Sequence, residues 1–208
     1  MNSGYEGIYR GLLARLLQWD LEEAARRLGL DYVGGAVRVR FLSREYEITR
    51  HGVEPLDGHP VNINTRNVLL YYLFSMGQGD PEDSYVLFEA IPRTITGLNS
   101  PGHLMSAPLE RHFGNDHARF GEAAARLGGT LGESTAHEHV WRFAVLPKIR
   151  LQAIFHDADD EFPATVQIML DRAAVRFLEF ECLAFMTGCV VRALIHTSQH
   201  GDVVGWDR

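Results

Sequence analysis

The chain has few cysteines: Cys182 and Cys189 are the two among its 208 residues. They lie in one helical pattern, where seven residues at a rise of about 1.5 Å separate them by roughly 10 Å. That exceeds the roughly 7 Å limit between the α-carbons of a disulfide. Two thiolates also fall short of the about four that an iron–sulfur cluster needs. We therefore predict that both cysteines are small buried hydrophobic residues.

Segments that would direct the chain into a membrane are also lacking. The opening residues, MNSGYEGIYR, have neither the basic start nor the apolar core of a signal peptide. The longest apolar run, CLAFMTGCVV, is half the length of about 20 residues that a membrane-spanning helix needs. We therefore expect a cytoplasmic protein without a membrane partner.

Positive charge and known catalytic motifs are scarce as well. The chain carries 20 basic and 27 acidic residues, for a net charge of −7. This balance makes a poor phosphate binder, so nucleic acid is not expected as a partner. The sequence contains no G-x-S-x-G, H-E-x-x-H, G-x-x-x-x-G-K-[ST] or G-x-G-x-x-G motif. No motif therefore identifies a reaction, and the cofactor stays unknown.

Helical and extended patterns are both present. Alternation of apolar and polar residues predicts a hairpin after residue 36, strands at SYVLFEAI, HVWRFAVL and IRLQAIFH, and loops over 50–66 and 93–106. Helical spacing predicts helices over 8–28, 65–77, 108–127, 163–178 and 179–196. The length suits one domain over 1–208. We predict an α+β fold, an antiparallel sheet packed by helices.

A weak internal repeat is visible. LEEAARRLG (21–29) is similar to FGEAAARLG (120–128), and NVLLYYL (67–73) aligns with QIMLDRA (167–173). One hypothesis is a duplicated αββα unit with pseudo-repeats 8–77 and 107–178. The alternative is that amphipathic helices rich in Ala, Leu, Arg and Glu resemble each other by composition. A duplication would place loops 50–66 and 156–163 on the two sides of one cleft.

Several stretches resemble a known family. LGGTLGE, NTRNVLLYYL and VLPKIRLQAIFHDADDEFPATVQIMLDRAAVRFLEFECL resemble the bacterial and archaeal family catalogued as domain of unknown function 3786. The resemblance covers nearly the whole chain. It implies one compact domain and a cofactor-related role, because some members look like fusions to cysteine-rich iron–sulfur modules. This chain lacks such a cysteine cluster, and the resemblance implies no catalytic residue.

The acidic stretch HDADDEFP (156–163) is the first candidate site. Its alternating acids resemble the start of a calcium-binding loop, but Phe162 and Ile168 stand where that loop needs a glycine and a bidentate acid. The structural alternative is that the acids precede a helix beginning at Pro163 and complement the helix dipole. The functional alternatives are a divalent-metal site or acid–base chemistry. The metal ligands would be His156, Asp157, Asp159 and Glu161, and the catalytic groups His156, Asp157, Asp160 and Glu161.

Histidines and isolated cations supply further candidates. His137 and His139 would share one face of a strand and could hold a metal, although nothing nearby in sequence completes the set. An exposed strand end is the simpler interpretation. Across the hypothetical cleft, His51, His59, Arg66 and Lys148 are the candidate cofactor-binding residues.

Three hypotheses of function follow. The first is a cytosolic domain that binds a small ligand or cofactor in the cleft between loops 50–66 and 156–163. The second is a metal-dependent or acid–base enzyme that uses the cluster 156–161. The third is an interaction module that forms a homodimer through the sheet or the C-terminal helices.

Overall fold

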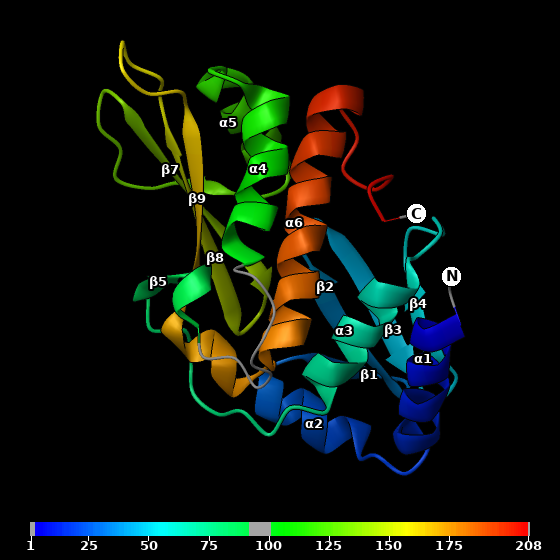
Figure 1. The fold of residues 1–208 in the computed structure, drawn as a ribbon. Helices are drawn as coiled ribbons and strands as arrows, with labels where there is room; N and C mark the ends of the chain where they lie inside the picture. The colour runs from blue at the N-terminus through cyan, green and yellow to red at the C-terminus, as the bar shows by residue number, and fades with distance from the viewer. Residues whose placement is uncertain (1–2, 92–100, 208) are drawn as a thin grey trace.

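The computed structural model describes residues 3–91 and 101–207. Within these ranges, two antiparallel sheets are covered by helices (Figure 1). The four-stranded sheet is a meander of β1 (Asp31–Val33), β2 (Ala36–Phe41), β3 (Arg44–Thr49) and β4 (Gly52–Pro55). The five-stranded sheet has the order β5 (Tyr85–Leu87), β9 (Thr165–Asp171), β8 (Ile149–His156), β7 (Glu138–Leu146) and β6 (Thr130–Leu131). The predicted α+β class is therefore confirmed.

The described helices connect and cover the two sheets. They are α1 (Ser3–Leu16), α2 (Leu21–Leu28), α3 (Ile63–Leu73), α4 (Pro101–Phe113), α5 (His117–Arg126) and α6 (Phe180–His200), with short 3-10 helices at Phe88–Ala90 and Arg172–Arg176. The single helix predicted over 8–28 is wrong, because Asp20 accepts a hydrogen bond from the Glu23 N–H and starts a second helix. The loop predicted over 50–66 contains β4 and the start of α3. Of the loop predicted over 93–106, the part from 101 is helical, and the rest lies outside the described residues.

The helix predicted over 163–178 is also wrong. Residues 165–171 form β9, which pairs with β8 in antiparallel register, Leu151 opposite Leu170 and His156 opposite Thr165. Val166, Ile168 and Leu170 are buried and alternate with more exposed residues, the period of a strand with one covered face. The acidic stretch after His156 therefore joins two strands of a hairpin, so it cannot cap a helix at Pro163.

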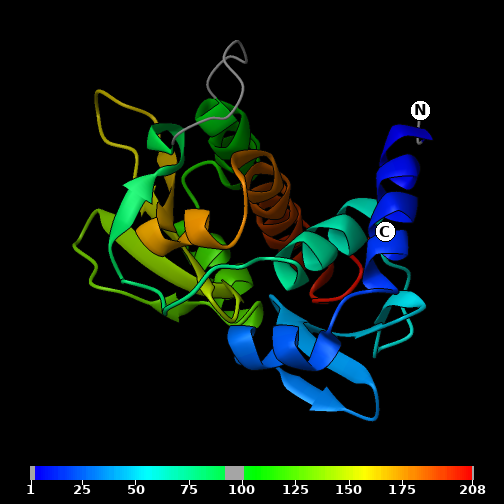
Figure 2. The same ribbon diagram turned by 90° about the horizontal axis from the view of Figure 1, so that it is seen from below.

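α6 is the central element of the core. Figures 1 and 2 show it between the two sheets, and most of its buried residues are apolar. Its length and mean hydropathy of 1.3 would allow it to cross a membrane, but 56% of that window is buried inside the protein. This is the pattern of a core helix, and among the described residues no other helix has that length and hydropathy.

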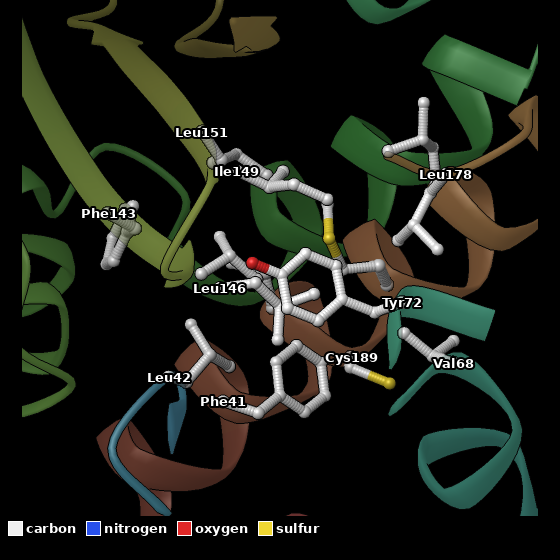
Figure 3. Packing of buried hydrophobic residues seen from close by; sticks show 14 of the residues in the cluster. Phe41, Leu42, Val68, Tyr72, Phe143, Leu146, Ile149, Leu151, Leu178 and Cys189 are labelled. Atoms are coloured by element: carbon white, nitrogen blue, oxygen red, sulfur yellow. The ribbon is translucent and has the colours of Figure 1, made fainter. Parts of the chain in front are cut away.

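The two sheets meet where their hairpin turns approach each other. The Leu42 N–H, between β2 and β3, donates a hydrogen bond to the Val145 carbonyl of β7 at 2.9 Å. The Tyr72 hydroxyl of α3 accepts one from the Lys148 N–H at 3.1 Å. Figure 3 shows residues of both halves, Phe41 and Leu42 with Leu146 and Ile149, packed around Tyr72. One continuous core thus joins the two sheets.

The repeat hypothesis takes a different form in the structure. A helix precedes a four-strand meander in each half: α2 before β1–β4, and α5 before β6–β9. Gly29 and Gly128 follow these helices with φ of 67° and 81°. However, 67–73 is helical, whereas 167–171 belong to β9 and 172–173 begin a 3-10 helix, so the predicted αββα alignment is wrong at this position. The duplication itself stays a hypothesis.

Candidate metal centre

The candidate site lies where β7 and β8 meet the start of α5. Side chains alternate across a strand, so His139 shares a face with Phe155, its partner in β8. Asp157 continues β8 by two residues beyond Phe155, and its N–H donates to the His137 carbonyl at 2.9 Å. His139 and Asp157 therefore lie on the same side of the sheet, the side that α4, α5 and α6 cover.

α5 brings the third residue of the site. Asp116 accepts a hydrogen bond from the Arg119 N–H at 2.9 Å, which starts the helix at His117. One turn later, the Phe120 ring packs against Phe155 with centroids 5.4 Å apart. This packing fixes α5 over the hairpin and holds His117 above His139.

The three side chains converge on one carboxylate. His117 Nδ1 lies 2.9 Å from Asp157 Oδ1, and His139 Nε2 lies 3.0 Å from Asp157 Oδ2. The two imidazole rings stack with centroids 3.9 Å apart and an angle of 18° between their planes. One atom of each residue lies within 4.8 Å of the others. Two imidazole nitrogens and the two oxygens of one carboxylate thus lie close together.

The carboxylate of Asp157 is held in its ionised form. Burial opposes its ionisation, but hydrogen bonds from His139 and His117 outweigh burial and lower its pKa below the ordinary value. The side chains of Asp157 and His139 are 14% and 19% exposed, and that of His117 is 45% exposed. The site is therefore lined by protein on one side and open to solvent on the other.

The loop after Asp157 is held by its own hydrogen bonds. Asn115, just before α5, accepts one from the Ala158 N–H at 2.8 Å. The Asp159 carboxylate accepts two, from the N–H groups of Glu161 and Phe162 at 2.8 and 2.7 Å. These backbone bonds lower the pKa of Asp159. Asp159 therefore shapes the hairpin loop and presents Asp157 to the helix.

Of the predicted acidic cluster, Asp157 alone joins the converging set. His156 points to the opposite face of the sheet, where its Nδ1 lies 3.1 Å from Glu138 Oε1. Asp160 and Glu161 are exposed on the hairpin loop. The predicted strand ends at His156, but the extended backbone continues to Asp157. Because side chains alternate along an extended chain, His156 and Asp157 lie on opposite faces of the sheet.

The four candidate cofactor-binding residues lie elsewhere. Arg66 binds Glu54 Oε1 at 3.0 Å, the His59 carbonyl accepts a hydrogen bond from Arg44 at 3.2 Å, and the His51 N–H donates to Thr49 at 3.1 Å. Lys148 lies at the β7–β8 turn, the opposite end of the hairpin from His139, and pairs with Asp80. Both views place β4 and the β8–β9 loop on opposite sides of the molecule (Figures 1 and 2). The predicted cleft between loops 50–66 and 156–163 is therefore wrong.

Comparison with known proteins gives a family and no activity. A family model described as "Domain of unknown function (DUF3786)" matches residues 20–193, a range that includes all three converging residues. Neither the curated proteins nor the solved structures include a significant match. The matched range covers most of the chain and agrees with the resemblance seen in the sequence. The chain therefore belongs to this family of domains of unknown function.

Proposed function

We propose that the protein binds a divalent transition-metal ion through His117, His139 and Asp157. The observation that carries the proposal is the convergence of two imidazole nitrogens on one carboxylate, at 2.9 and 3.0 Å. Imidazole and carboxylate are the ligands that Zn²⁺ and neighbouring divalent ions use in proteins. The ionised state of Asp157 supplies the negative charge that such an ion requires.

The spacing supports a tetrahedral ion. Ligand atoms about 2.0 Å from a tetrahedral zinc ion are about 3.3 Å from one another. The two nitrogens lie 2.9 and 3.0 Å from different oxygens of Asp157, and one ligand atom of each residue lies within 4.8 Å of the others, so small side-chain rotations would bring the three to this spacing. An ion would enter by displacing the protons that the two ring nitrogens donate to Asp157, with small rotations of the rings. Its affinity would fall with falling pH, because protons compete for both nitrogens.

Three protein ligands favour a reactive site over a structural one. Structural zinc sites have four protein ligands, whereas catalytic sites have three and keep one position for water or substrate. The exposure of His117 leaves that position facing solvent. We infer a metal-dependent enzyme in which the ion lowers the pKa of a bound water or polarises a substrate oxygen.

Replacing Asp157 with asparagine is expected to lower Zn²⁺ affinity by at least about 100-fold, because even residues behind the ligands typically contribute about 10–100-fold. His139→Ala should have a similar effect. Isothermal titration calorimetry gives the affinities, and the visible spectrum of bound Co²⁺ reports its coordination. Circular dichroism melts check that each variant is folded.

His156→Ala is the matched control, since His156 is adjacent in sequence but lies on the other face of the sheet. It should bind Zn²⁺ like the wild type. Equal losses in His156→Ala and Asp157→Asn would place the ion in the acidic loop instead. If the wild type binds neither Zn²⁺ nor Co²⁺, the proposal is wrong.

A further inference from the structure

A concave site lies among α1, α3, the 3-10 helix Arg172–Arg176 and the start of α6, and its lining includes none of the three proposed metal ligands. Figure 2 shows α3 between α1 and α6. The cavity has a volume of about 590 Å³. Sites for small organic ligands typically have about 300–1,000 Å³, so the cavity has room for one.

Exposed apolar side chains gather in this cavity. Among the described residues, about half of the large hydrophobic side chains that are exposed line it: Tyr5, Ile8, Tyr71, Met76, Val175 and Phe185. Tyr5 and Phe185 form an edge-to-face pair with ring centroids 5.5 Å apart. Concentration of exposed apolar surface in a hollow is typical of a binding site.

The charges of the lining are unevenly placed. Arg176 is paired with Glu82, and the guanidinium of Arg15 lies over the Trp19 and Phe74 rings, 4.6 and 4.4 Å from their centroids. Glu179 and Glu181 form no ion pair with any residue in 3–91 or 101–207. The α6 end of the cavity thus has two carboxylates without an ion-pair partner in the described part of the chain, while the Arg15 guanidinium lies against aromatic rings.

The carboxylates contribute to the raised pKa values of two neighbouring side chains, Cys182 and Tyr71. Burial, together with the charges of Glu179 and Glu181, raises the pKa of the Cys182 thiol to about 12. Burial raises the pKa of Tyr71 as well, with smaller contributions in the same direction from Cys182 and Glu179 and an opposing one from Arg15. Both side chains therefore stay neutral, and Glu179 and Glu181 supply the negative charge at the α6 end of the cavity.

Two carboxamide side chains, Asn64 and Asn67, also line the cavity. The Asn67 Nδ2 donates a hydrogen bond to the Tyr5 carbonyl at 3.2 Å. The Asn67 Oδ1 is buried and accepts no hydrogen bond from the described residues. The Asn64 Oδ1 is likewise buried without a donor. Both residues line the cavity, so the polar part of its lining includes two carboxamide side chains.

We propose that this cavity binds a small organic cation, with an apolar or aromatic body between the rings and a protonated amine facing Glu179 and Glu181. The aromatic walls contribute to binding the cation through their ring faces. The amine pairs with the two carboxylates. A carboxylate-bearing ligand of the same shape is repelled at this end of the cavity.

Three matched probes test the charge preference: naphthylmethylamine, naphthylmethanol and naphthylacetate, titrated into the intact chain and followed by naphthalene fluorescence. The amine should bind at least about fivefold more tightly than the alcohol, and the acetate more weakly than both. Added salt should weaken the binding of the amine and leave the binding of the alcohol unchanged, because the alcohol carries no charge.

Variants locate the site. Glu179→Gln/Glu181→Gln should remove the preference for the amine, and its folding should be intact because the Glu179 side chain makes no capping hydrogen bond. Phe185→Ala should weaken the binding of all three probes. The control is Glu122→Gln on α5, which changes an exposed acid outside the cavity lining. It should leave the affinities of all three probes unchanged.

Several results would overturn the proposal. One is equal binding of the amine and the acetate, and another is a preference for the amine that survives in the double variant. Absence of binding by all three probes at millimolar concentration would also overturn it. If light scattering shows a dimer that Phe185→Glu dissociates, a second copy of the chain covers this surface and the assignment to a small molecule is wrong.

Discussion

Replacing Arg44 with methionine is expected to lower the free energy of unfolding by about 3–5 kcal/mol, the usual cost of removing one partner from a buried ion pair. The Arg44 side chain is fully buried. It binds both oxygens of Asp57 at 2.8 Å and one oxygen of Asp207 at 3.3 Å. Its remaining N–H groups reach the His59 and Pro60 carbonyls. Methionine would fill much of the space and satisfy none of these acceptors.

The cost is large because the carboxylates would stay behind. Asp207 is fully buried and also accepts hydrogen bonds from Thr65 at 2.6 Å and Tyr46 at 3.0 Å. Without the guanidinium, the buried Asp207 and the partly exposed Asp57 would lose the cation that they share. Arg44 therefore ties together β3, the loop before α3 and the C-terminal segment.

The destabilisation should depend on pH. In the wild type, the hydrogen bond from Arg44 lowers the pKa of Asp57, so Asp57 adds stability that is present above the pKa of the unfolded chain and is lost on acidification. Burial raises the pKa of Asp207, an effect with the opposite sign that would grow without Arg44. The difference between wild type and variant should therefore be largest at neutral pH and shrink as the carboxyls become protonated.

Urea unfolding at neutral and acidic pH measures both effects. Arg38→Met is the matched control: Arg38 pairs with Glu47 at 3.1 Å on the neighbouring strand, with side chains 49% and 30% exposed. An exposed pair of this kind contributes about 0–1 kcal/mol. Similar losses in Arg38→Met and Arg44→Met would show that the buried network does not stabilise the fold as described.

Periodicity explains which elements could be predicted. The strands over 36–49 and 138–156 follow from clear alternation, and α6 from a long apolar helical pattern. The segment 163–178 combines a strand with a 3-10 helix, and its Ala, Leu and Arg residues imitate one amphipathic helix. Its alternation of Val166, Ile168 and Leu170 is decisive only once β8 is known to lie beside it.

The candidate metal centre depends on contacts that no local pattern contains. His139 and Asp157 were both candidates, but the pairing of β7 with β8 is what brings them together. His117 comes from a helix whose position is set by Phe120 against Phe155. The sequence groups Asp157 with its acidic neighbours, whereas its hydrogen-bond partners His139 and His117 lie 18 and 40 residues away.

Replacing Gly77 with alanine is expected to lower the free energy of unfolding by about 3 kcal/mol, the upper part of the usual range for overpacking. A Cβ on Gly77 would lie 2.4 Å from the Arg176 carbonyl oxygen and 2.7 Å from a ring carbon of Phe177. The oxygen belongs to the backbone, so relief requires α3 and the 3-10 helix to move apart. That movement would also weaken the hydrogen bond from the Ser75 hydroxyl to the Arg176 carbonyl.

Gly11→Ala provides a control of opposite sign. Gly11 lies within α1, and a Cβ there meets no atom within 4 Å. Alanine is the better helix former by about 1 kcal/mol, so this variant should be more stable than the wild type. Urea unfolding of both variants separates the crowding of Gly77 from the general effect of adding a methyl group. A Gly77→Ala protein as stable as the wild type would mean that residues 75–77 do not pack against residues 176–177 in solution.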